Sequence, residues 1–367
     1  MKQYMPTKVY LENNAVSSHG SELAALGTKA MIVTGRSSSR KNGSLFDVTH
    51  ALEVQGIPFV VFNEIEENPS VETTVKAAEK AIEAGADFFI GIGGGSPMDA
   101  AKTISLLACN PAQISNARSF LYQTQEAQHY PVAEVPTTSG TGSEVTPFSI
   151  LTLHDKNTKK STAHLVFAEL ALVDPRYLKT SSYHGMVSTC VDALAHTIES
   201  YLHTFATPFS RMYAAEGMRI WGSVKENLTS EENFRAMDDG AFAAFMQASV
   251  LAGMAIAHTS TSIPHGLSYA VTYELGVPHG KAVGMFLPGF LQTYGNQSEV
   301  SDVLELLGFG SVGEFSDYIH TLLGDVELPA ALWEKDIELL LSNPVKLKNY
   351  PFPLTRAQLE AYLPASH

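Results

Sequence analysis

The residues best suited to chemistry begin with a carboxylate and an imidazole four positions apart. Asp192 and His196 stand in VDALAHTIESY, a segment whose other residues favour a helix. At that spacing both side chains lie on one helix face, about one turn apart, where they can bind the same ion. A solvated pair on a helix surface is the alternative for such a pair taken alone.

Two further histidines share a repeated local pattern. In SIPHGLSYAVTYELGVPHG, His265 and His279 each follow a proline and precede a glycine. Gly276 and Pro278 should break the intervening helix, so we expect His279 to lie on a loop that folds back to the site. One carboxylate and three neutral imidazoles suit a borderline divalent ion such as Fe(II) or Zn(II), and not Ca(II). The predicted metal ligands are Asp192, His196, His265 and His279.

A glycine-rich turn follows a short apolar run. In FFIGIGGGSPMDAAK, an expected strand runs into Gly93, Gly94, Gly95 and Ser96, and Pro97 then opens an expected helix. Glycine lets the backbone approach a ligand, and proline is favoured at the first helical position, so free N–H groups point at the turn. The pattern predicts a pyrophosphate site. A structural turn is the alternative, because the motif is neither G-x-G-x-x-G nor a P-loop.

A second loop, rich in hydroxyl groups, follows another β-rich run. Residues 136–146 read PTTSGTGSEVT and come directly after VAEV. Small donors at the carboxyl end of a strand suit a phosphate, ribose or carboxamide, and a hydrogen-bonded surface loop is the alternative. Because both strand ends would fall on the same edge of a parallel sheet, the two loops together predict a dinucleotide site more strongly than either alone.

The elements that must position these residues change in kind along the chain. Short β-rich runs lie at 30–34, 59–62, 88–92 and 132–135. They alternate with helical stretches such as 71–84, which indicates a parallel sheet with helices on both faces. After LALVDP the rest reads as amphipathic helices. We expect an α/β cofactor-binding domain at 1–178 and an all-helical, metal-binding catalytic domain at 179–367.

Composition excludes several classes of function. The chain has 367 residues, of which 45% are hydrophobic and 17% charged, as expected for a globular protein of two domains. A net charge of −14 disfavours nucleic acid and anionic lipid as partners. There is no long uncharged apolar run and no signal-peptide core, and Cys109 and Cys190 lie in apolar segments. We therefore expect a cytoplasmic protein with reduced thiols and no membrane partner.

Together the motifs resemble the iron-containing (group III) alcohol dehydrogenase family over essentially the whole chain. The matching segments are GGGSPMDAAK, PTTSGTGSEVT, VDALAH and PHGKAVG. The resemblance implies the dehydroquinate synthase-like fold of this family, commonly a homodimer, and the same four metal ligands, with Fe(II) expected first and Zn(II) second. It also implies cofactor contacts at Asn68, Gly94, Gly95, Ser96, Asp99, Thr137, Thr138, Ser139, Thr146, Leu151 and Lys160.

The substrate side of the site is less defined. The resemblance places Phe148, Leu151 and Tyr269 near the metal, which favours a small, fairly apolar substrate. Tyr269 stands where many family members carry a histidine proposed to help relay the proton. Its hydroxyl can serve the same purpose, but a tyrosine on an apolar helix face is more often a packing residue. The proton route is therefore not carried over from the family.

A second departure concerns the cofactor. NAD-preferring relatives place an acidic residue after the first strand, where this chain has Gly35. A carboxylate would repel a 2′-phosphate, whereas glycine removes that repulsion and nearby cations and hydroxyls can bind the group. We predict NADP(H) over NAD(H). The predicted contacts are Gly35, Arg36, Ser37, Ser38, Ser39, Arg40 and Lys41.

The resulting hypothesis is a metal-dependent oxidoreductase that transfers a hydride between NADP(H) and a small primary alcohol or aldehyde, with the ion polarising the substrate oxygen. A zinc-type, glycerol-like polyol dehydrogenase using NAD is the first alternative, and four well-spaced ligands disfavour it. A dehydroquinate-synthase-like lyase is the second, disfavoured by the scarcity of Lys and Arg around the ligands. A binding protein that has lost catalysis is the third, disfavoured because all four ligand positions carry suitable residues.

Overall fold

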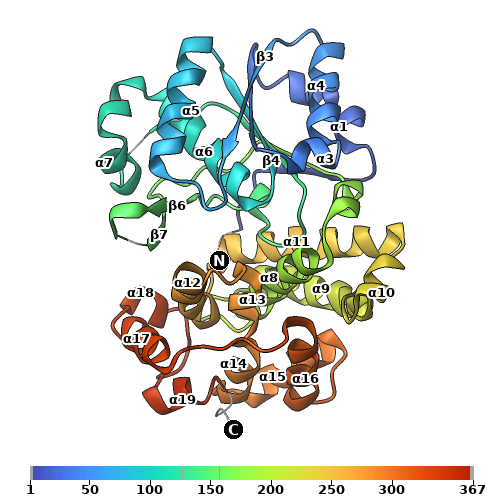
Figure 1. Ribbon diagram of the computed structural model, residues 1–367, viewed down its shortest axis with the longest axis vertical. Helices are drawn as coiled ribbons and strands as arrows, with labels where there is room; N and C mark the ends of the chain where they lie inside the picture. Colours follow the sequence, from blue (N-terminus) through green and yellow to red (C-terminus); the bar gives the residue numbers. More distant parts are fainter. Residues whose placement is uncertain (1–2, 126, 157, 364–367) are drawn as a thin grey trace. The chain divides into compact units, whose positions relative to one another are not determined.

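The computed structural model describes residues 3–125, 127–156 and 158–363. Internal packing divides the described chain into two compact units (Figure 1). The α/β unit consists of Met5–Thr138 and Gly142–Thr180. The helical unit consists of the described residues of Met1–Tyr4, Ser139–Thr141 and Ser181–His367. The main division of the chain falls after residue 180.

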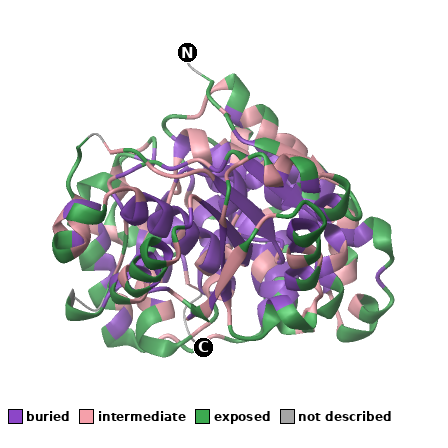
Figure 2. Cartoon of the chain, turned by 90° about the horizontal axis from the view of Figure 1, so that it is seen from above, coloured by how far each residue is buried: buried purple, intermediate pink, exposed green. Residues whose placement is uncertain are grey.

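The α/β unit is built on a six-stranded sheet in the order β1-β8-β5-β4-β2-β3. Every neighbouring pair of strands is parallel. The strands are β1 (Lys8–Leu11), β2 (Ala30–Gly35), β3 (Phe59–Ile65), β4 (Phe88–Gly93), β5 (Val132–Pro136) and β8 (Leu170–Val173). Figure 2 shows buried residues gathered along these strands, and β4 and β5 are buried throughout.

Two apolar cores lie on opposite faces of this sheet. Because successive strand residues point to opposite faces, Ile32 and Ile90 belong to one core and their neighbours Met31 and Phe89 to the other. The helices of this unit are α1 (Ala15–Ser18), α2 (Gly20–Ala24), α3 (Ser38–Lys41), α4 (Ser44–Val54), α5 (Val71–Ala84), α6 (Gly95–Cys109) and α7 (Ala117–Tyr122). Helices α1 and α4 cover the first core and α5, α6 and α7 the second, which confirms the expected sheet with helices on both faces.

Two features of this unit were not expected from the sequence. Strand β1 has four residues and gives too short a signal to stand out. The antiparallel hairpin of β6 (Ile150–Leu153) and β7 (Thr158–Ser161) also lacks a clear pattern, because β7 reads TKKS and has no apolar residue. Short 3-10 helices connect elements in both units, at Pro111–Asn116, Ser143–Val145, His154–Lys156, Pro175–Thr180 and Lys225–Leu228.

The helical unit contains no β-strand among its described residues, as expected. Its helices are α8 (Tyr183–Tyr201), α9 (Pro208–Val224), α10 (Glu231–Arg235), α11 (Asp239–Thr259), α12 (Ile263–Leu275), α13 (His279–Gly284), α14 (Leu287–Thr293), α15 (Gln297–Leu307), α16 (Val312–Leu323), α17 (Ala330–Leu341), α18 (Pro344–Leu347) and α19 (Arg356–Glu360). Helix α11 is long and apolar enough to cross a membrane, but most of it is buried inside the unit, as a core helix would be.

Candidate metal centre and cofactor site

Helix α8 carries two predicted metal ligands on one buried face. The helix begins after Ser182, whose hydroxyl accepts a hydrogen bond from the Gly185 amide. Asp192 and His196 are 4% and 6% exposed, and His196 Nε2 lies 3.8 Å from Asp192 Oδ1. His196 Nδ1 lies 3.3 Å from the carbonyl oxygen of Gly140. Because a carbonyl only accepts, Nδ1 carries the proton in this bond and Nε2 presents a lone pair.

Helix α12 brings a third ligand to the same place. The chain enters it through Ser260, which has a φ of +73°, and Pro264 is tolerated in the first turn because its missing N–H has no partner to lose there. The helix ends at Leu275, before the left-handed Gly276. His265, in the first turn, is 3% exposed, and its Nε2 lies 3.3 Å from Asp192 Oδ1.

His279 is the first residue of α13, so the expectation that it lies on a loop is wrong. Gly276 and Pro278 do end α12, but a proline just before a helix start is also compatible with a new helix. Helix α13 packs closely on α8, and a Cβ atom at Gly280 would fall 1.7 Å from the Ser188 carbonyl oxygen. This close approach, which only glycine permits, brings His279 Nε2 to 3.8 Å from Asp192 Oδ1.

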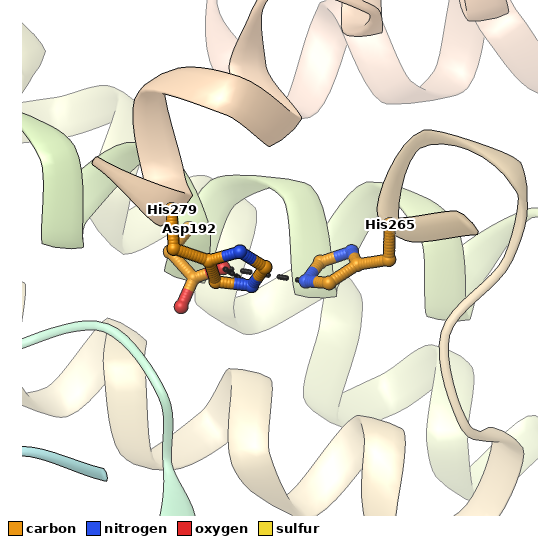
Figure 3. A group of neighbouring side chains, drawn as sticks. All are labelled: Asp192, His265 and His279. Atoms are coloured by element: carbon orange, nitrogen blue, oxygen red, sulfur yellow. Dashed lines mark ion pairs between the residues drawn. The ribbon is translucent and has the colours of Figure 1, made fainter. Parts of the chain in front are cut away.

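Three imidazoles thus converge on one carboxylate oxygen. Figure 3 shows the rings of His265 and His279 beside Asp192, and one ligand atom from each of these residues lies within 4.8 Å of the other two. His196 reaches the same carboxylate oxygen at 3.8 Å, and its ring stacks on that of His265 with centroids 4.6 Å apart. Two of the ligands come from α8, one from α12 and one from α13.

The donor atoms at this point suit a metal ion. Asp192 Oδ1 and His265 Nε2 are buried, and neither forms a hydrogen bond with any part of the chain that the structure describes. Buried polar atoms are rarely left without a partner. A carboxylate oxygen and imidazole lone pairs are ligands that Fe(II) and Zn(II) accept, so the residues fit a borderline divalent ion.

The electrostatics of the cluster favour a cation. Burial would raise the pKa of Asp192, but His196, His265 and His279 outweigh it and hold that pKa below its usual range. Burial lowers the pKa of His196. Burial would also lower the pKa of His265, yet the carboxylates of Glu199 and Asp192 raise it to about 10. The buried carboxylates of Asp192 and Glu199 therefore make the electrostatic potential at the imidazoles negative, and an ion of charge +2 would balance their two charges.

Glu199 belongs to this cluster and was not among the predicted site residues. It lies on α8, is fully buried, and its Oε1 lies 2.5 Å from His265 Nδ1. A signal was available in the sequence, because Asp192, His196 and Glu199 recur at the i, i+4 and i+7 positions of one helix face.

Tyr269 lies beside the predicted ligands. Its ring is nearly parallel to that of His279, with centroids 6.3 Å apart. The ammonium of Lys346 lies 5.5 Å from the centroid of the Tyr269 ring, within range of a cation–π interaction. Both contacts use the ring, which is how a packing residue behaves.

In the α/β unit, the glycine-rich turn joins β4 to α6. Helix α6 begins at Gly95, so the expected start at Pro97 is two residues too late. Pro97 is tolerated there because the first amides of a helix have no partner within it. Gly93 has a φ of +149°, and a Cβ on it would lie 2.7 Å from Pro97 Cγ, so only glycine fits. The first amides of this 15-residue helix, which include those of Gly95 and Ser96, have no partner within the helix and are suited to an anion.

Asn68 lies next to this helix start. Its backbone has a φ of +60°, and its N–H donates to Ser96 Oγ at 3.1 Å. Lys159 Nζ donates to Asn68 Oδ1 at 2.7 Å. Lys160, the predicted contact, instead lies with its ammonium 5.1 Å from the Tyr122 ring centroid. Because neighbouring strand residues point to opposite faces, β7 turns Lys159 and not Lys160 toward Asn68.

The hydroxyl-rich loop divides between the two units. The Thr137 amide donates to the Gly93 carbonyl at 2.8 Å, and Thr138 Oγ1 would lie 3.2 Å from a Cβ on Gly94, so both threonines adjoin the glycine turn. Ser139 is fully buried in the helical unit, where its Oγ lies 3.3 Å from Cys190 Sγ.

A buried ion pair holds the rest of this loop. Lys102 is fully buried, and its ammonium donates to the carbonyl oxygens of Ser143 at 2.6 Å, Thr146 at 2.9 Å and Phe148 at 3.1 Å. The Asp99 carboxylate lies 3.9 Å from that ammonium and accepts the Ser143 hydroxyl at 2.5 Å. Asp99 also accepts the Ile150 amide. Asp99, a predicted cofactor contact, is thus hydrogen-bonded to Ser143 and Ile150. Two other predicted cofactor contacts, Thr146 and Leu151, are buried.

The end of β2 carries the predicted 2′-phosphate residues. The exposed side chains there are Arg36, Ser37, Ser38, Arg40 and Lys41. Ser39 differs, because it is fully buried and its Oγ accepts the Thr34 hydroxyl at 2.8 Å. Glu64 is an acidic group near these cations. Lys76, at 2.6 Å, lowers the pKa of Glu64 most, and Lys80 and Arg36 lower it further.

Two family models match most of the chain. The model described as iron-containing alcohol dehydrogenase matches residues 6–175, and that of the C-terminal part of the Fe-containing alcohol dehydrogenase family matches residues 186–339. The chain belongs to the iron-containing alcohol dehydrogenase family. The resemblance seen in the motifs is therefore confirmed.

Relatives agree with this family membership. An iron-containing alcohol dehydrogenase from Thermotoga maritima is 37% identical, with a TM-score of 0.88 and 98% of each chain covered. Long-chain-alcohol dehydrogenase 1 of Geobacillus thermodenitrificans is 29% identical over 94% of this chain and 91% of the relative. NADPH-dependent butanol dehydrogenase of Clostridium saccharobutylicum is 31% identical over 71% of this chain and 66% of the relative. The chain is accordingly an alcohol dehydrogenase of the iron-containing type.

Proposed function

We propose that this alcohol dehydrogenase transfers a hydride between NADP(H) and a small primary alcohol or aldehyde. The observation that carries the proposal is the convergence of His196, His265 and His279 on Asp192 Oδ1 in a chain of this family. These four residues would hold one divalent ion, Fe(II) foremost and Zn(II) as the alternative. When bound, such an ion acts as a Lewis acid toward the substrate oxygen.

The chain's own residues bind and orient the reactants. The free amides at the start of α6 suit the pyrophosphate of the cofactor, and Asn68, Thr137 and Thr138 lie around that helix start. Tyr269 packs its ring against His279 and would form a wall of the substrate site. Fixing the reactants in one orientation can contribute several kcal/mol to the reaction.

NADP(H) as the preferred cofactor rests on the end of β2. Gly35 places no carboxylate there, and Arg36, Arg40 and Lys41 are exposed beside it, together with the hydroxyls of Ser37 and Ser38. Cations of this kind bind a 2′-phosphate through charge-assisted hydrogen bonds. Ser39 is not included, because its hydroxyl is buried against Thr34.

The test is a steady-state comparison of the two cofactors. The purified protein is stripped of metal, refilled with Fe(II) or Zn(II), and assayed with primary alcohols, diols and aldehydes. We expect activity only after refilling, and a kcat/KM for NADP+ at least about tenfold above that for NAD+. A preference for NAD+ together with a diol would instead support the polyol dehydrogenase, and activity that survives metal removal would contradict the metal proposal.

Assembly and location are further proposals. We propose a homodimer in the cytoplasm, supported by the family and by Cys109 and Cys190, which form no disulfide. The net charge of −14 continues to disfavour nucleic acid as a partner. Light scattering on a size-exclusion column would test the dimer, with a mass near twice 39.6 kDa as the expected result.

A further inference from the structure

Glu199 uses both oxygens of its carboxylate, and each contacts the segment that carries His265. Oε1 lies 2.5 Å from His265 Nδ1. Oε2 accepts a hydrogen bond from the Ser262 amide. Glu199 is fully buried on α8, so neither bond competes with solvent. The carboxylate therefore ties the helix of Asp192 and His196 to the start of α12.

The bond to Ser262 places a negative charge at a helix N-terminus. Ser262 immediately precedes α12, and its own side chain makes no capping hydrogen bond. A carboxylate at this position both accepts an amide that has no partner within the helix and interacts favourably with the helix dipole. Glu199 thus supplies, from another helix, an acceptor for the amide of the N-cap residue Ser262.

The turn before α12 needs such support. Ser260 has a φ of +73°, a conformation that side chains other than glycine rarely adopt and that persists only when its surroundings hold it. Lys346 Nζ donates to Thr261 Oγ1 at 2.9 Å, and Asn349 Nδ2 donates to the Thr261 carbonyl at 2.8 Å. With the bonds from Glu199, this turn is held from α8 and from the chain near α18.

The bond to Nδ1 also decides which nitrogen of His265 faces the ligand cluster. A carboxylate only accepts, so Nδ1 donates and its proton stays on that side of the ring. The opposite nitrogen, Nε2, lies 3.3 Å from Asp192 Oδ1, and it is the nitrogen that would lose its proton and supply a lone pair when an ion is bound. A metal-bound histidine is commonly oriented in this way by a carboxylate behind it.

We propose that Glu199 is a positioning residue of the metal centre, which fixes the ring orientation and the tautomer of His265 and holds the strained turn that carries it. The proposal rests on the proposed metal-dependent function. Glu199 would act through His265, and it is not one of the four predicted ligands. Its charge, with that of Asp192, also matches a divalent cation.

The test is the metal affinity of the Glu199→Gln variant of the full chain, measured with Co(II) and Zn(II) against a competing chelator. The amide has nearly the same shape, but it loses the charge and one acceptor. We expect a Kd that is about 10- to 100-fold weaker and a changed visible spectrum of bound Co(II). The matched control is Glu134→Gln, another fully buried glutamate, on β5 of the α/β unit, which should leave both readouts unchanged.

A Kd and a Co(II) spectrum equal to those of the control would overturn the proposal. If Glu199→Gln does not fold, the wild-type protein answers the question by NMR with 15N-labelled histidine. We expect the Zn(II)-loaded protein to show slowly exchanging Nδ1–H signals from both His196 and His265, and the second signal to be absent in His265→Ala. A protonated Nε2 at His265 would overturn the proposal. Failure of the proposed function looks different, because the wild-type protein would then bind neither metal.

Discussion

The predicted metal ligands and the predicted cofactor contacts differ in how well the type of a residue indicates that it binds a ligand. In the cluster, Asp192, His196 and His265 lie on buried helices and meet at one point. In the α/β unit, Ser39 is a predicted contact whose hydroxyl is already engaged by the fold, and the carboxylate of Asp99 is engaged in the same way. The sequence predicts both kinds of residue, yet the structure gives them different surroundings.

The difference has a physical origin. An imidazole or carboxylate in an apolar helix is expensive to bury, so it is kept there only if something compensates for the lost water. A bound metal ion is one of the few partners that can compensate for that loss. A hydroxyl costs less to bury, because a backbone carbonyl can accept its proton, as the Ile92 carbonyl does for Thr34 on β2. Spacing is therefore stronger evidence for the metal ligands than for individual cofactor contacts.

The largest effect is expected from His265→Ala. It removes a central ligand, so we expect loss of stoichiometric metal and a fall in kcat of about 10³-fold or more. Metal content by atomic emission and turnover on the refilled protein measure both. His320→Ala is the control, because that side chain is 67% exposed and should change neither quantity. If His265→Ala keeps both its metal and its turnover, His265 is not a metal ligand, and helix spacing would no longer be stronger evidence for the metal ligands than for the cofactor contacts.

Next in size is Lys102→Met, which tests whether the cofactor loop is held by the buried ion pair. Removing the ammonium takes a hydrogen-bond donor away from the buried carbonyl oxygens of Ser143, Thr146 and Phe148 and removes the cation beside the Asp99 carboxylate. We therefore expect a loss of about 3–5 kcal/mol in the free energy of unfolding. We also expect a higher KM for the cofactor. Urea unfolding and steady-state kinetics measure these changes. The exposed Lys80→Met should stay within about 0.5 kcal/mol of wild type.

A third prediction concerns pH and Glu144, a buried carboxyl in the same loop. Burial raises its pKa from 4.5 to about 7, so the folded protein holds this proton more tightly than the unfolded chain does. This stabilisation is complete at low pH and is lost as the pH rises through about 7. Glu144→Gln should flatten that fall in unfolding free energy by a few kcal/mol, on the order of 2–3. Parallel curves for the two proteins between about pH 5 and pH 8 would contradict the prediction.

The smallest effect is expected from Gly35→Asp, which tests one of the predicted cofactor contacts. A Cβ on Gly35 has only the Ile65 carbonyl oxygen nearby, at 3.6 Å, so a Cβ atom meets no steric clash there. The new carboxylate should repel a 2′-phosphate and lower kcat/KM for NADP+ about tenfold, or about 1.4 kcal/mol, while NAD+ is little affected. An unchanged ratio of the two efficiencies would show that the 2′-phosphate does not lie near Gly35.

Much of the fold could be predicted because its signals are local. Residues 71–84 form α5 as expected, since their apolar residues recur at helical spacing and Gly85 ends the helix in a left-handed conformation. Strand β7 could not be predicted, because TKKS is stabilised by its partner β6 and not by its own pattern. The start of α13 at His279 was missed for a related reason, since its packing on α8 lies beyond local sequence.

The sequence by itself determined which residues could bind a metal, because residue type sets the ligand chemistry and the helix period places Asp192, His196 and Glu199 on one face. Only the tertiary structure decided how the site is assembled. It brings α12 and α13 against α8, turns His265 Nε2 toward Asp192 through Glu199, and selects Lys159 over Lys160 beside Asn68. Spacing specifies neighbours within one element, whereas contacts between elements depend on packing that no short segment encodes.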